Sequence, residues 1–119
     1  MDTNNAIDAF SALAQPTRLD IFRRLIKAGT DGLSAGAVAE AVEGRQNTVS
    51  NHLSVLARAG LIEGQRDGRT ITYRANFAQA GQLVAFLLED CCGGRPEICA
   101  PLVNTLSCLQ PDTAETCCD

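Results

Sequence analysis

The polar and apolar positions of this 119-residue chain repeat first with helical spacing, then in alternation, then with helical spacing again. Two apolar stripes in residues 6–26 recur every three to four residues, which is the spacing of one helix face. Pro16 separates them, because a proline disfavours helix in the preceding residue but suits a first helical turn. The stripes therefore predict one helix that ends near Gln15 and a second that ends at Gly29. Their apolar positions are Ala6, Ile7, Phe10, Leu13 and Ala14 in the first, and Leu19, Phe22, Leu25 and Ile26 in the second.

Two more short helices are predicted before the pattern changes. Ser34 is a suitable N-cap for a helix over residues 35–42, and Gly44 would end it. The next helix is predicted to run from about Gln46 to Ala59 and to close at Gly60. Their inward positions are Val38, Ala41 and Val42 in the first, and Val49, Leu53 and Leu56 in the second.

An alternating segment follows and predicts a pair of strands. The arms 61–66 and 69–75 flank the dipeptide Asp67-Gly68, which is a strong signal for a two-residue hairpin turn. With four helices before it and one after it, this hairpin predicts a mainly α domain of the α+β class.

The last predicted helix covers residues 77–92 and is stopped by Gly93-Gly94. Three prolines and little periodicity follow, so we expect a loosely ordered end. The chain is therefore predicted to comprise one folded domain, residues 1–92, and a cysteine-rich tail, residues 93–119.

Composition argues against a membrane or secreted protein. No apolar run approaches the roughly 18 residues that a membrane-spanning helix needs. The N-terminal stretch carries Asp2 and Asp8 and has no basic residue before Arg18, which is unlike a signal peptide. We therefore expect a cytoplasmic protein without a membrane partner, whose cysteines stay reduced.

The net charge of −4 hides a basic middle. Residues 45–74 carry five arginines against Glu63 and Asp67, whereas the flanking blocks are acidic. A basic segment in an acidic chain indicates a local contact with a polyanion, although a solvated basic surface gives the same pattern.

The order helix, helix, hairpin predicts a winged helix-turn-helix that binds double-stranded DNA. The second of these helices places amides and hydroxyls opposite its apolar face, where they can contact base edges in a major groove. Arginines on either side would contact phosphate. An amphipathic helix with an ordinary polar outer face is the alternative, and His52 is expected to pack at the edge of the buried face. The candidate DNA-binding residues are Arg45, Gln46, Asn47, Thr48, Ser50, Asn51, Ser54, Arg66 and Arg69.

Three segments together resemble the ArsR/SmtB family of winged-helix repressors. The stretch LAQPTRLDI at 13–21 is similar to the second-helix signature of that family. QNTVSNHLSVL at 46–56, followed by AGLI and the hairpin at 67–74, resembles its recognition helix and wing. The resemblance covers residues 6 to about 90 and implies a repressor that leaves its operator when an inducer binds.

The same resemblance implies a homodimer formed by the first and last helices. The apolar content of these two helices agrees with it, because Ile7, Phe10, Leu83, Phe86 and Leu87 exceed what one small core needs. Completion of the core within one protomer is the alternative. A twofold dimer should bind a palindromic operator with half-sites about one helical turn apart.

All six cysteines lie in the last 29 residues, beginning with Cys91, Cys92 and Cys99. Adjacent cysteines have Cα atoms about 3.8 Å apart, closer than disulfides normally bridge. Gly93-Gly94 would let the chain turn back and bring Cys99 to the pair. Three thiolates suit trivalent arsenic or antimony, whereas zinc prefers four ligands, and Cys108 could supply the fourth for zinc or cadmium.

CCGGRPEIC at 91–99 resembles the inducer site of an arsenic-responsive branch of the family. The resemblance implies that Cys91, Cys92 and Cys99 bind As(III) as inducer, with no organic cofactor. Two other family sites are not matched, because residues 35–43 lack cysteine and residues 77–92 lack histidine. Cys108, Cys117 and Cys118 could widen arsenic capture or be incidental to a thiol-rich end, and the second interpretation is favoured.

Two alternatives to arsenite sensing remain at this stage. The same repressor could respond to methylarsenite, antimonite, cadmium, zinc or thiol oxidation. A thiol enzyme is a different class of function, but it would need a cysteine at a helix N-terminus or in Cys-x-x-Cys. The vicinal pair instead lies at the C-terminus of a predicted helix, where the dipole disfavours a thiolate, and Cys-x-x-Cys is missing, so we predict a chain that is not an enzyme.

Overall fold

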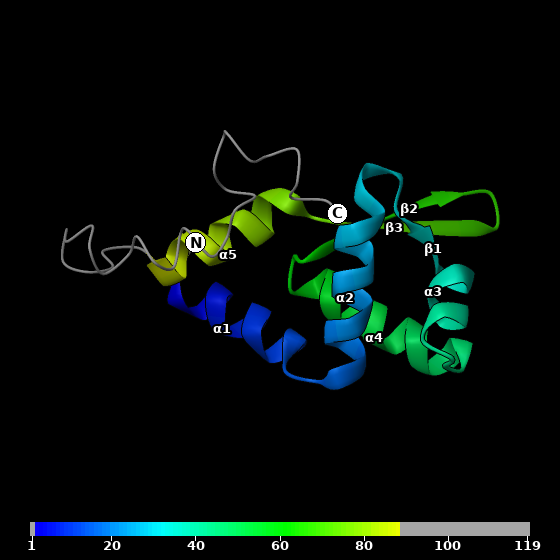
Figure 1. Cartoon of the computed structure of the whole chain (residues 1–119), viewed down its shortest axis with the longest axis horizontal. Coiled ribbons are helices and arrows are strands. Elements are labelled where there is room, and N and C mark those ends of the chain that lie inside the picture. Colours follow the sequence, from blue (N-terminus) through cyan, green and yellow to red (C-terminus); the bar gives the residue numbers. More distant parts are fainter. Residues whose placement is uncertain (1, 89–119) are drawn as a thin grey trace. The chain divides into compact units, whose positions relative to one another are not determined.

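The computed structural model describes residues 2–88 of the chain (Figure 1). Residues 2–83 form one compact unit, whereas Val84–Leu88 belong to a second unit and are considered by themselves. The predicted boundary between residues 1–92 and 93–119 stays a prediction. The described elements are α1 (Thr3–Leu13), α2 (Pro16–Ala28), a 3-10 turn η1 (Gly29–Asp31), β1 (Leu33–Ser34), α3 (Ala35–Ala41), α4 (Gln46–Arg58), β2 (Ile62–Asp67), β3 (Thr70–Ala75) and α5 (Phe77–Leu88).

Side-chain caps fix where the helices begin. Ser34 accepts a hydrogen bond from the backbone N–H of Ala37 at the start of α3, as predicted. Gln15 does the same for Arg18 in α2, whose first residue is Pro16. The sequence signals at these two boundaries are therefore confirmed.

Helix α4 supplies the centre of the core. Its Val49, Leu53 and Leu56 are buried, as predicted, and they meet apolar residues of α2 and α3. Each fully buried side chain of this size contributes about 1.5–3 kcal/mol relative to an exposed one. The largest fully buried side chains are Ile21, Leu25, Val38, Val49, Leu53, Leu56 and Leu61.

Three predicted apolar faces differ from those observed. In α3 the buried residues are Val38 and Ala39, whereas the predicted Ala41 and Val42 are half-buried. In α2 the core takes Ile21 and Leu25, and Leu19 is 44 % exposed, because the apolar arc of this helix is wider than its contact with the core. In α1 the buried residues are the small Ala6, Ala9 and Ala12, which leaves Ile7 and Phe10 exposed.

The sheet has three antiparallel strands in the order β1-β3-β2, one more than predicted. Its hairpin turn lies one residue further along than expected. Asp67 pairs with Thr70, so the two loop residues are Gly68 and Arg69. Gly68 has φ +64°, the left-handed value that the first loop position of a type II′ turn requires.

The observed register has a physical reason. A turn at Asp67-Gly68 would place Arg66 directly opposite Arg69, and like charges at such positions repel. The observed pairing places Arg66 opposite Ile71 and Gly64 opposite Tyr73. A Cβ at Gly64 would lie 2.9 Å from Cε1 of Tyr73, so the glycine leaves room for the ring.

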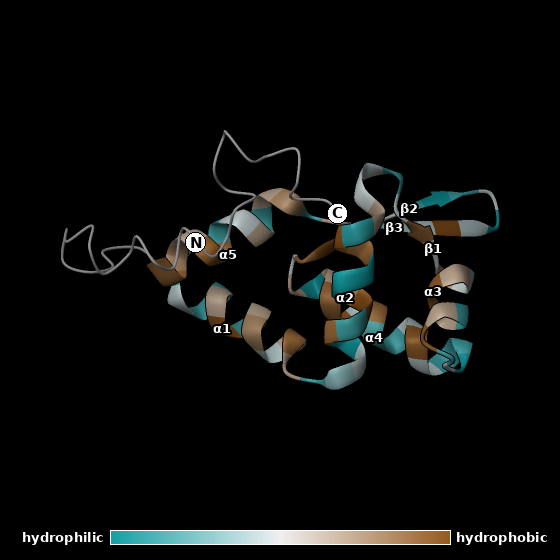
Figure 2. Ribbon diagram, in the orientation of Figure 1, coloured by the Kyte–Doolittle hydropathy of each residue, from teal (hydrophilic) through white to brown (hydrophobic). Residues whose placement is uncertain are grey.

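Helix α1 and strand β2 differ clearly in hydropathy. Figure 2 shows α1 as mainly hydrophobic and the β2 arrow as hydrophilic. Only the first residue of β2 is buried, and the other five are exposed. Among the described residues, no helix is long and apolar enough to cross a membrane.

Candidate nucleic-acid interface

Helices α3 and α4 form the helix-turn-helix that the sequence predicts. The turn between them is short, and Gly44 donates a backbone hydrogen bond to the carbonyl of Ala39 at 3.0 Å. A Cβ at Gly44 would lie 2.9 Å from Cγ2 of Val49, so the turn packs closely on the first turns of α4. This packing fixes the orientation of the N-terminal half of α4 relative to α3.

The polar face of α4 is exposed along the helix. All the candidate residues from Gln46 to Ser54 have exposed side chains, whereas His52 is half-buried. Helical spacing separates the candidates into two rows, Gln46 with Ser50 and Asn47 with Asn51 and Ser54. Thr48 lies outside both rows, on the flank that it shares with His52.

A hollow of about 290 Å³ joins α4 to the wing. Gln46 and Ser50 line it from α4, and Arg69 lines it from the hairpin turn. The structure thus brings together three of the predicted DNA-binding residues from segments about 20 residues apart in the sequence. Amide, hydroxyl and guanidinium groups side by side are suited to a phosphate and the adjacent base edges.

Ser34 and Thr70 also line this hollow, although neither is among the predicted DNA-binding residues. The sequence predicts only a helix cap at Ser34. Its pairing with Thr72 through the short strand β1 brings the start of α3 to the wing. A two-residue strand is too short to leave an alternating pattern, so no sequence signal marked this contact.

The start of α4 has free backbone donors. Arg45 is the N-cap residue, and its side chain makes no capping hydrogen bond. The N–H groups of the first helical turn therefore face outward without a side-chain acceptor, beside an exposed guanidinium. Such a helix start attracts an anionic group.

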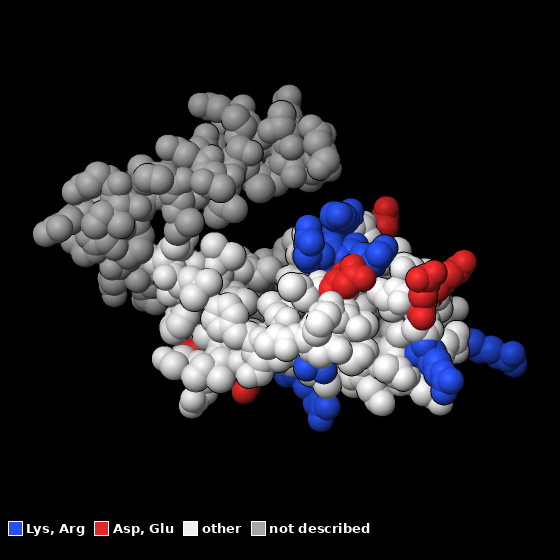
Figure 3. Space-filling model, turned by 60° about the horizontal axis from the view of Figure 1, so that its bottom comes forward, with Lys and Arg blue, Asp and Glu red and all other residues white. Residues whose placement is uncertain are grey.

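Basic side chains near the wing tip are exposed but dispersed. Arg66 and Arg69 both have exposed side chains, and Asp67 lies between them in the sequence. On the face drawn in Figure 3, the Lys and Arg side chains form several separate groups instead of one continuous basic patch. On that face, the basic side chains are suited to separate phosphate contacts and do not form one broad electrostatic surface.

Comparison with known proteins agrees with this geometry. A helix-turn-helix domain family matches residues 13–65. The transcriptional repressor SdpR of Bacillus subtilis is 35 % identical over 82 residues, which are 69 % of this chain and 88 % of that protein. The chain belongs to the ArsR/SmtB family of helix-turn-helix transcriptional regulators.

Two solved structures of ArsR-family relatives have the same fold. An ArsR-like transcriptional regulator from Rhodococcus sp. RHA1 superposes with a TM-score of 0.62 at 28 % identity, covering 90 % of this chain and 91 % of that one. The homodimeric winged helix-turn-helix domain Mb0332 from Mycobacterium bovis gives a TM-score of 0.58 at 28 % identity, covering 73 % and 81 %. The predicted winged helix-turn-helix is thereby confirmed.

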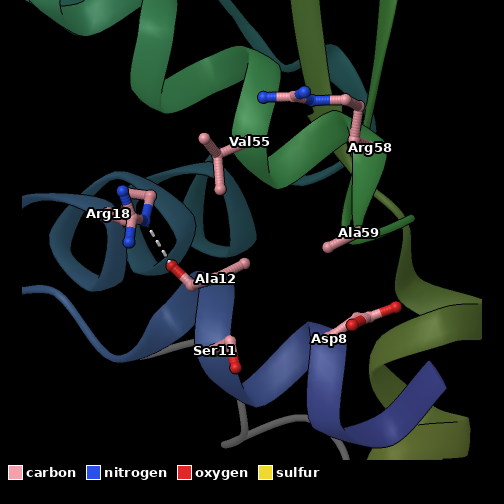
Figure 4. A pocket seen from close by; sticks show the side chains of 7 residues that line it. All are labelled: Asp8, Ser11, Ala12, Arg18, Val55, Arg58 and Ala59. Carbon is pink, nitrogen blue, oxygen red and sulfur yellow. Dashed lines mark hydrogen bonds between the residues drawn. The ribbon is translucent and has the colours of Figure 1, made fainter. Parts of the chain in front are cut away.

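Membership in the ArsR/SmtB family makes this chain a DNA-binding transcriptional repressor and not an enzyme. Its signature residue Arg18 has a visible structural role. Nε of Arg18 donates to the carbonyl of Ala12 at 2.6 Å, as the dashed line in Figure 4 shows. The guanidinium thus satisfies a free carbonyl at the end of α1. Its positive charge also interacts favourably with the negative end of that helix dipole.

Arg18 also borders a second hollow of about 390 Å³, between α1, α2 and α4. Figure 4 shows Asp8 on the opposite side of this hollow from Arg18, and Arg58 extending across its α4 side. The apolar floor is formed by Ala12, Val55 and Ala59. Since its charged groups have opposite signs and Arg18 is already bonded, this hollow lacks the convergent polar groups of the α4–wing hollow.

No group of three or more His, Cys, Asp or Glu side chains in residues 2–88 is arranged to hold a metal ion. Cys91, Cys92 and Cys99, the predicted ligands of As(III), lie outside the described residues. Cys108, Cys117 and Cys118 do so as well.

Proposed function

We propose that this repressor responds to arsenite and acts in the cytoplasm. Two copies bind a palindromic operator, each with α4 in a major groove and its wing on the neighbouring backbone. As(III) bound to Cys91, Cys92 and Cys99 then releases the dimer from DNA. The observation that carries the DNA-binding part is the hollow in which Gln46 and Ser50 of α4 meet Arg69 of the wing.

The exposed polar face of α4 supports base contacts. Asn47, Asn51 and Ser54 share one face and project from a helix whose other side is buried, so the protein determines their position before DNA binds. Amides and hydroxyls in such positions donate and accept hydrogen bonds at base edges. Arg45, Arg66 and Arg69 would supply the surrounding phosphate contacts.

The exposed apolar residues of α1 support a homodimer. Ile7 is 54 % exposed and Phe10 is 37 % exposed, although neighbouring positions of the same helix are fully buried. Large apolar side chains at these exposures indicate a surface that a partner covers. Leu83, in contrast, is 7 % exposed and belongs to the protomer core, not to the predicted excess. The homodimeric state of the Mb0332 domain agrees with this proposal.

The inducer follows from the sequence pattern at 91–99. Trivalent arsenic binds three thiolates, and this segment offers three cysteines within nine residues. Binding need only favour the free conformation of the dimer by 1–3 kcal/mol, or slightly more, to change operator occupancy strongly.

Operator binding tests the DNA-binding half of the proposal. Double-stranded DNA that binds the full chain is selected from a random library, and its half-sites should lie about one helical turn apart. The selected sequences should be palindromic, and shortening the half-site spacing by five base pairs should abolish binding. Selection of single, unpaired half-sites would contradict DNA binding as a dimer.

Arsenite titration of the protein–operator complex tests the inducer. Cys91→Ser and Cys92→Ser should bind the operator like the unmodified chain and should no longer be released by arsenite. Cys108→Ser is the matched control, because it removes one thiol from outside the predicted triad and should keep the response. Release of the Cys91→Ser protein by arsenite at unchanged concentration would exclude the proposed site.

A different thiophilic inducer is the alternative within the same DNA-binding function. Methylarsenite needs only two thiolates, so a Cys99→Ser protein that responds to methylarsenite but not to arsenite would favour it. Antimonite, cadmium, zinc and an oxidant such as diamide are titrated in parallel. The ligand that releases the operator complex at the lowest concentration identifies the signal.

A further inference from the structure

Arg74, near the base of the wing, makes two hydrogen bonds that join three segments of the chain. Its Nε donates to the carbonyl oxygen of Thr30 at 2.8 Å, and Thr30 lies 44 residues earlier, in η1. Its Nη1 donates to Oε1 of Gln65 in β2 at 2.9 Å. The guanidinium therefore connects β3, β2 and the turn that follows α2.

The acceptor in η1 is held firmly against the sheet. Gly32 follows η1 with φ +69°, a left-handed value at which a side chain is strained. A Cβ there would collide with the carbonyl oxygen of Tyr73 and lie 2.9 Å from Cγ of Arg74. The main chain of this turn thus lies directly on β3, which makes the Thr30 carbonyl a fixed anchor.

The tip of the wing has no such support. Strand β1 pairs with β3 only at Tyr73 and Thr72, so from Ile71 outward β2 and β3 are paired only with each other. A two-stranded hairpin is marginally stable on its own. Arg69 lies five residues from Arg74, roughly 16 Å along an extended strand, so a small rotation at the base displaces the tip considerably.

Arg74 is not among the residues that line the interface hollow. Successive strand residues alternate between faces, so Arg74 shares its face with Thr72 and Gln65 and not with Ile71. Thr70 and Ile71 line the hollow that contains Gln46 and Arg69, whereas Arg74 lines a separate hollow beside Gln65 and Arg66. Two of its donors are engaged by Thr30 and Gln65, and Arg74 is half-buried.

We propose that Arg74 is a positioning residue for DNA binding, which holds the wing so that Arg66 and Arg69 reach the phosphate backbone while Arg74 itself does not touch DNA. This inference rests on the proposed wing contacts. One guanidinium, bound at two points, thus sets the position of the wing, which a positive charge alone could not do.

The salt dependence of operator affinity tests this role, because each lost phosphate contact reduces the slope of log affinity against log salt by about 0.9. Fluorescence anisotropy is measured on the full chain with the selected operator at several salt concentrations. Arg66→Ala/Arg69→Ala defines the slope without wing contacts. Arg74→Gln should show at least half of that reduction and an affinity about tenfold lower near physiological salt.

Arg74→Lys is the control that separates charge from geometry. A flexible ammonium keeps the charge but cannot reproduce the two fixed bonds of the guanidinium, so this variant should behave like Arg74→Gln. Gln65→Ala, which removes one of the two bonds, should show an intermediate slope. Circular dichroism checks that each variant is folded, and Arg74→Lys and Gln65→Ala carry the test if Arg74→Gln does not fold.

The outcomes separate three explanations. Full recovery of the slope by Arg74→Lys would overturn the proposal, since a charge contact with DNA would then be sufficient. Added to Arg66→Ala/Arg69→Ala, Arg74→Gln should cause no further loss, and an additive loss would likewise mean direct contact. An unchanged slope in Arg66→Ala/Arg69→Ala would instead contradict the wing contacts of the proposed function, and the positioning role with them.

Discussion

The recognition helix and the wing hold their proposed DNA-binding side chains on very different supports. Helix α4 is fixed along its whole apolar side by Val49, Leu53 and Leu56, all of which are buried. The wing is fixed only at its base, where β1 pairs with β3 and Arg74 binds Thr30 and Gln65. In the proposed function, base contacts, which require accurate placement, would therefore come from a helix fixed by the core, and phosphate contacts from a hairpin anchored at its base.

This difference means that mutations should impair the two regions in different ways. Loss of core packing under α4 should reduce the stability of the whole domain, because the same residues support the helix and the fold. Loss of the anchor at the wing base should change operator affinity and its salt dependence with a smaller effect on stability.

The largest effect is expected for Leu53→Ala, directly beneath the polar face of α4. Leu53 is fully buried, so the truncation should lower the free energy of unfolding by about 3 kcal/mol. Urea denaturation followed by circular dichroism measures this loss. Leu19→Ala is the matched control, because Leu19 is 44 % exposed and its truncation should cost less than about 1 kcal/mol. Equal losses in the two variants would show that α4 does not rest on a core of this kind.

The next effect is expected at the wing base. Gly32→Ala should destabilise the domain by about 2 kcal/mol, because alanine is strained at φ +69° and its Cβ would meet the backbone of Tyr73. Thermal unfolding and the salt slope of operator binding should both change, since the anchor of Arg74 moves.

Gly36→Ala is the matched control for Gly32→Ala. Gly36 lies in α3, and a Cβ there would have no neighbour within 4 Å. Because alanine favours helix over glycine, this variant should be as stable as the unmodified chain or up to about 1 kcal/mol more stable. A loss of stability in Gly36→Ala as large as that in Gly32→Ala would show that the turn before β1 is not specially constrained.

The contrast between the two regions also explains what the sequence could predict. The helix-turn-helix was predictable because α3 and α4 have local signals, namely the Ser34 cap and the apolar spacing of Val49, Leu53 and Leu56. The polar face of α4 followed as the complement of its buried face. Each of these inferences depends on spacing within one helix.

The wing depends on contacts across the chain, which sequence spacing does not reveal. The hairpin was predicted, but its turn was placed one residue early, because Asp67-Gly68 and Gly68-Arg69 are both suitable turn pairs. The repulsion that the other register would create between Arg66 and Arg69, and the fit of Tyr73 over Gly64, both favour the observed register. Likewise, nothing in the local sequence linked Arg74 to Thr30, and the apolar arc of α2 was too wide to show that Leu19 is exposed.

A comparison of one residue from each region gives the third prediction. Asn51→Ala should lower operator affinity about tenfold through loss of a base contact, with an unchanged salt slope. Arg69→Ala should reduce the salt slope by about 0.9 for each wing and weaken selected and scrambled DNA alike. Anisotropy with both DNAs distinguishes the two. Loss of sequence preference in Arg69→Ala, or loss of slope in Asn51→Ala, would reverse the roles assigned to helix and wing.

The smallest effect is expected at Ser34, the residue that belongs to both regions. Its hydroxyl caps α3, whereas its backbone, in β1, pairs with Thr72 of the wing. Ser34→Ala removes only the cap and should cost about 1 kcal/mol in thermal unfolding, and Ser34→Thr should recover most of it. The salt slope should stay unchanged in both variants, because the backbone pairing remains. A reduced slope in Ser34→Ala alone would mean that the hydroxyl contacts phosphate in the hollow beside Arg69, and that helix and wing share this part of the interface.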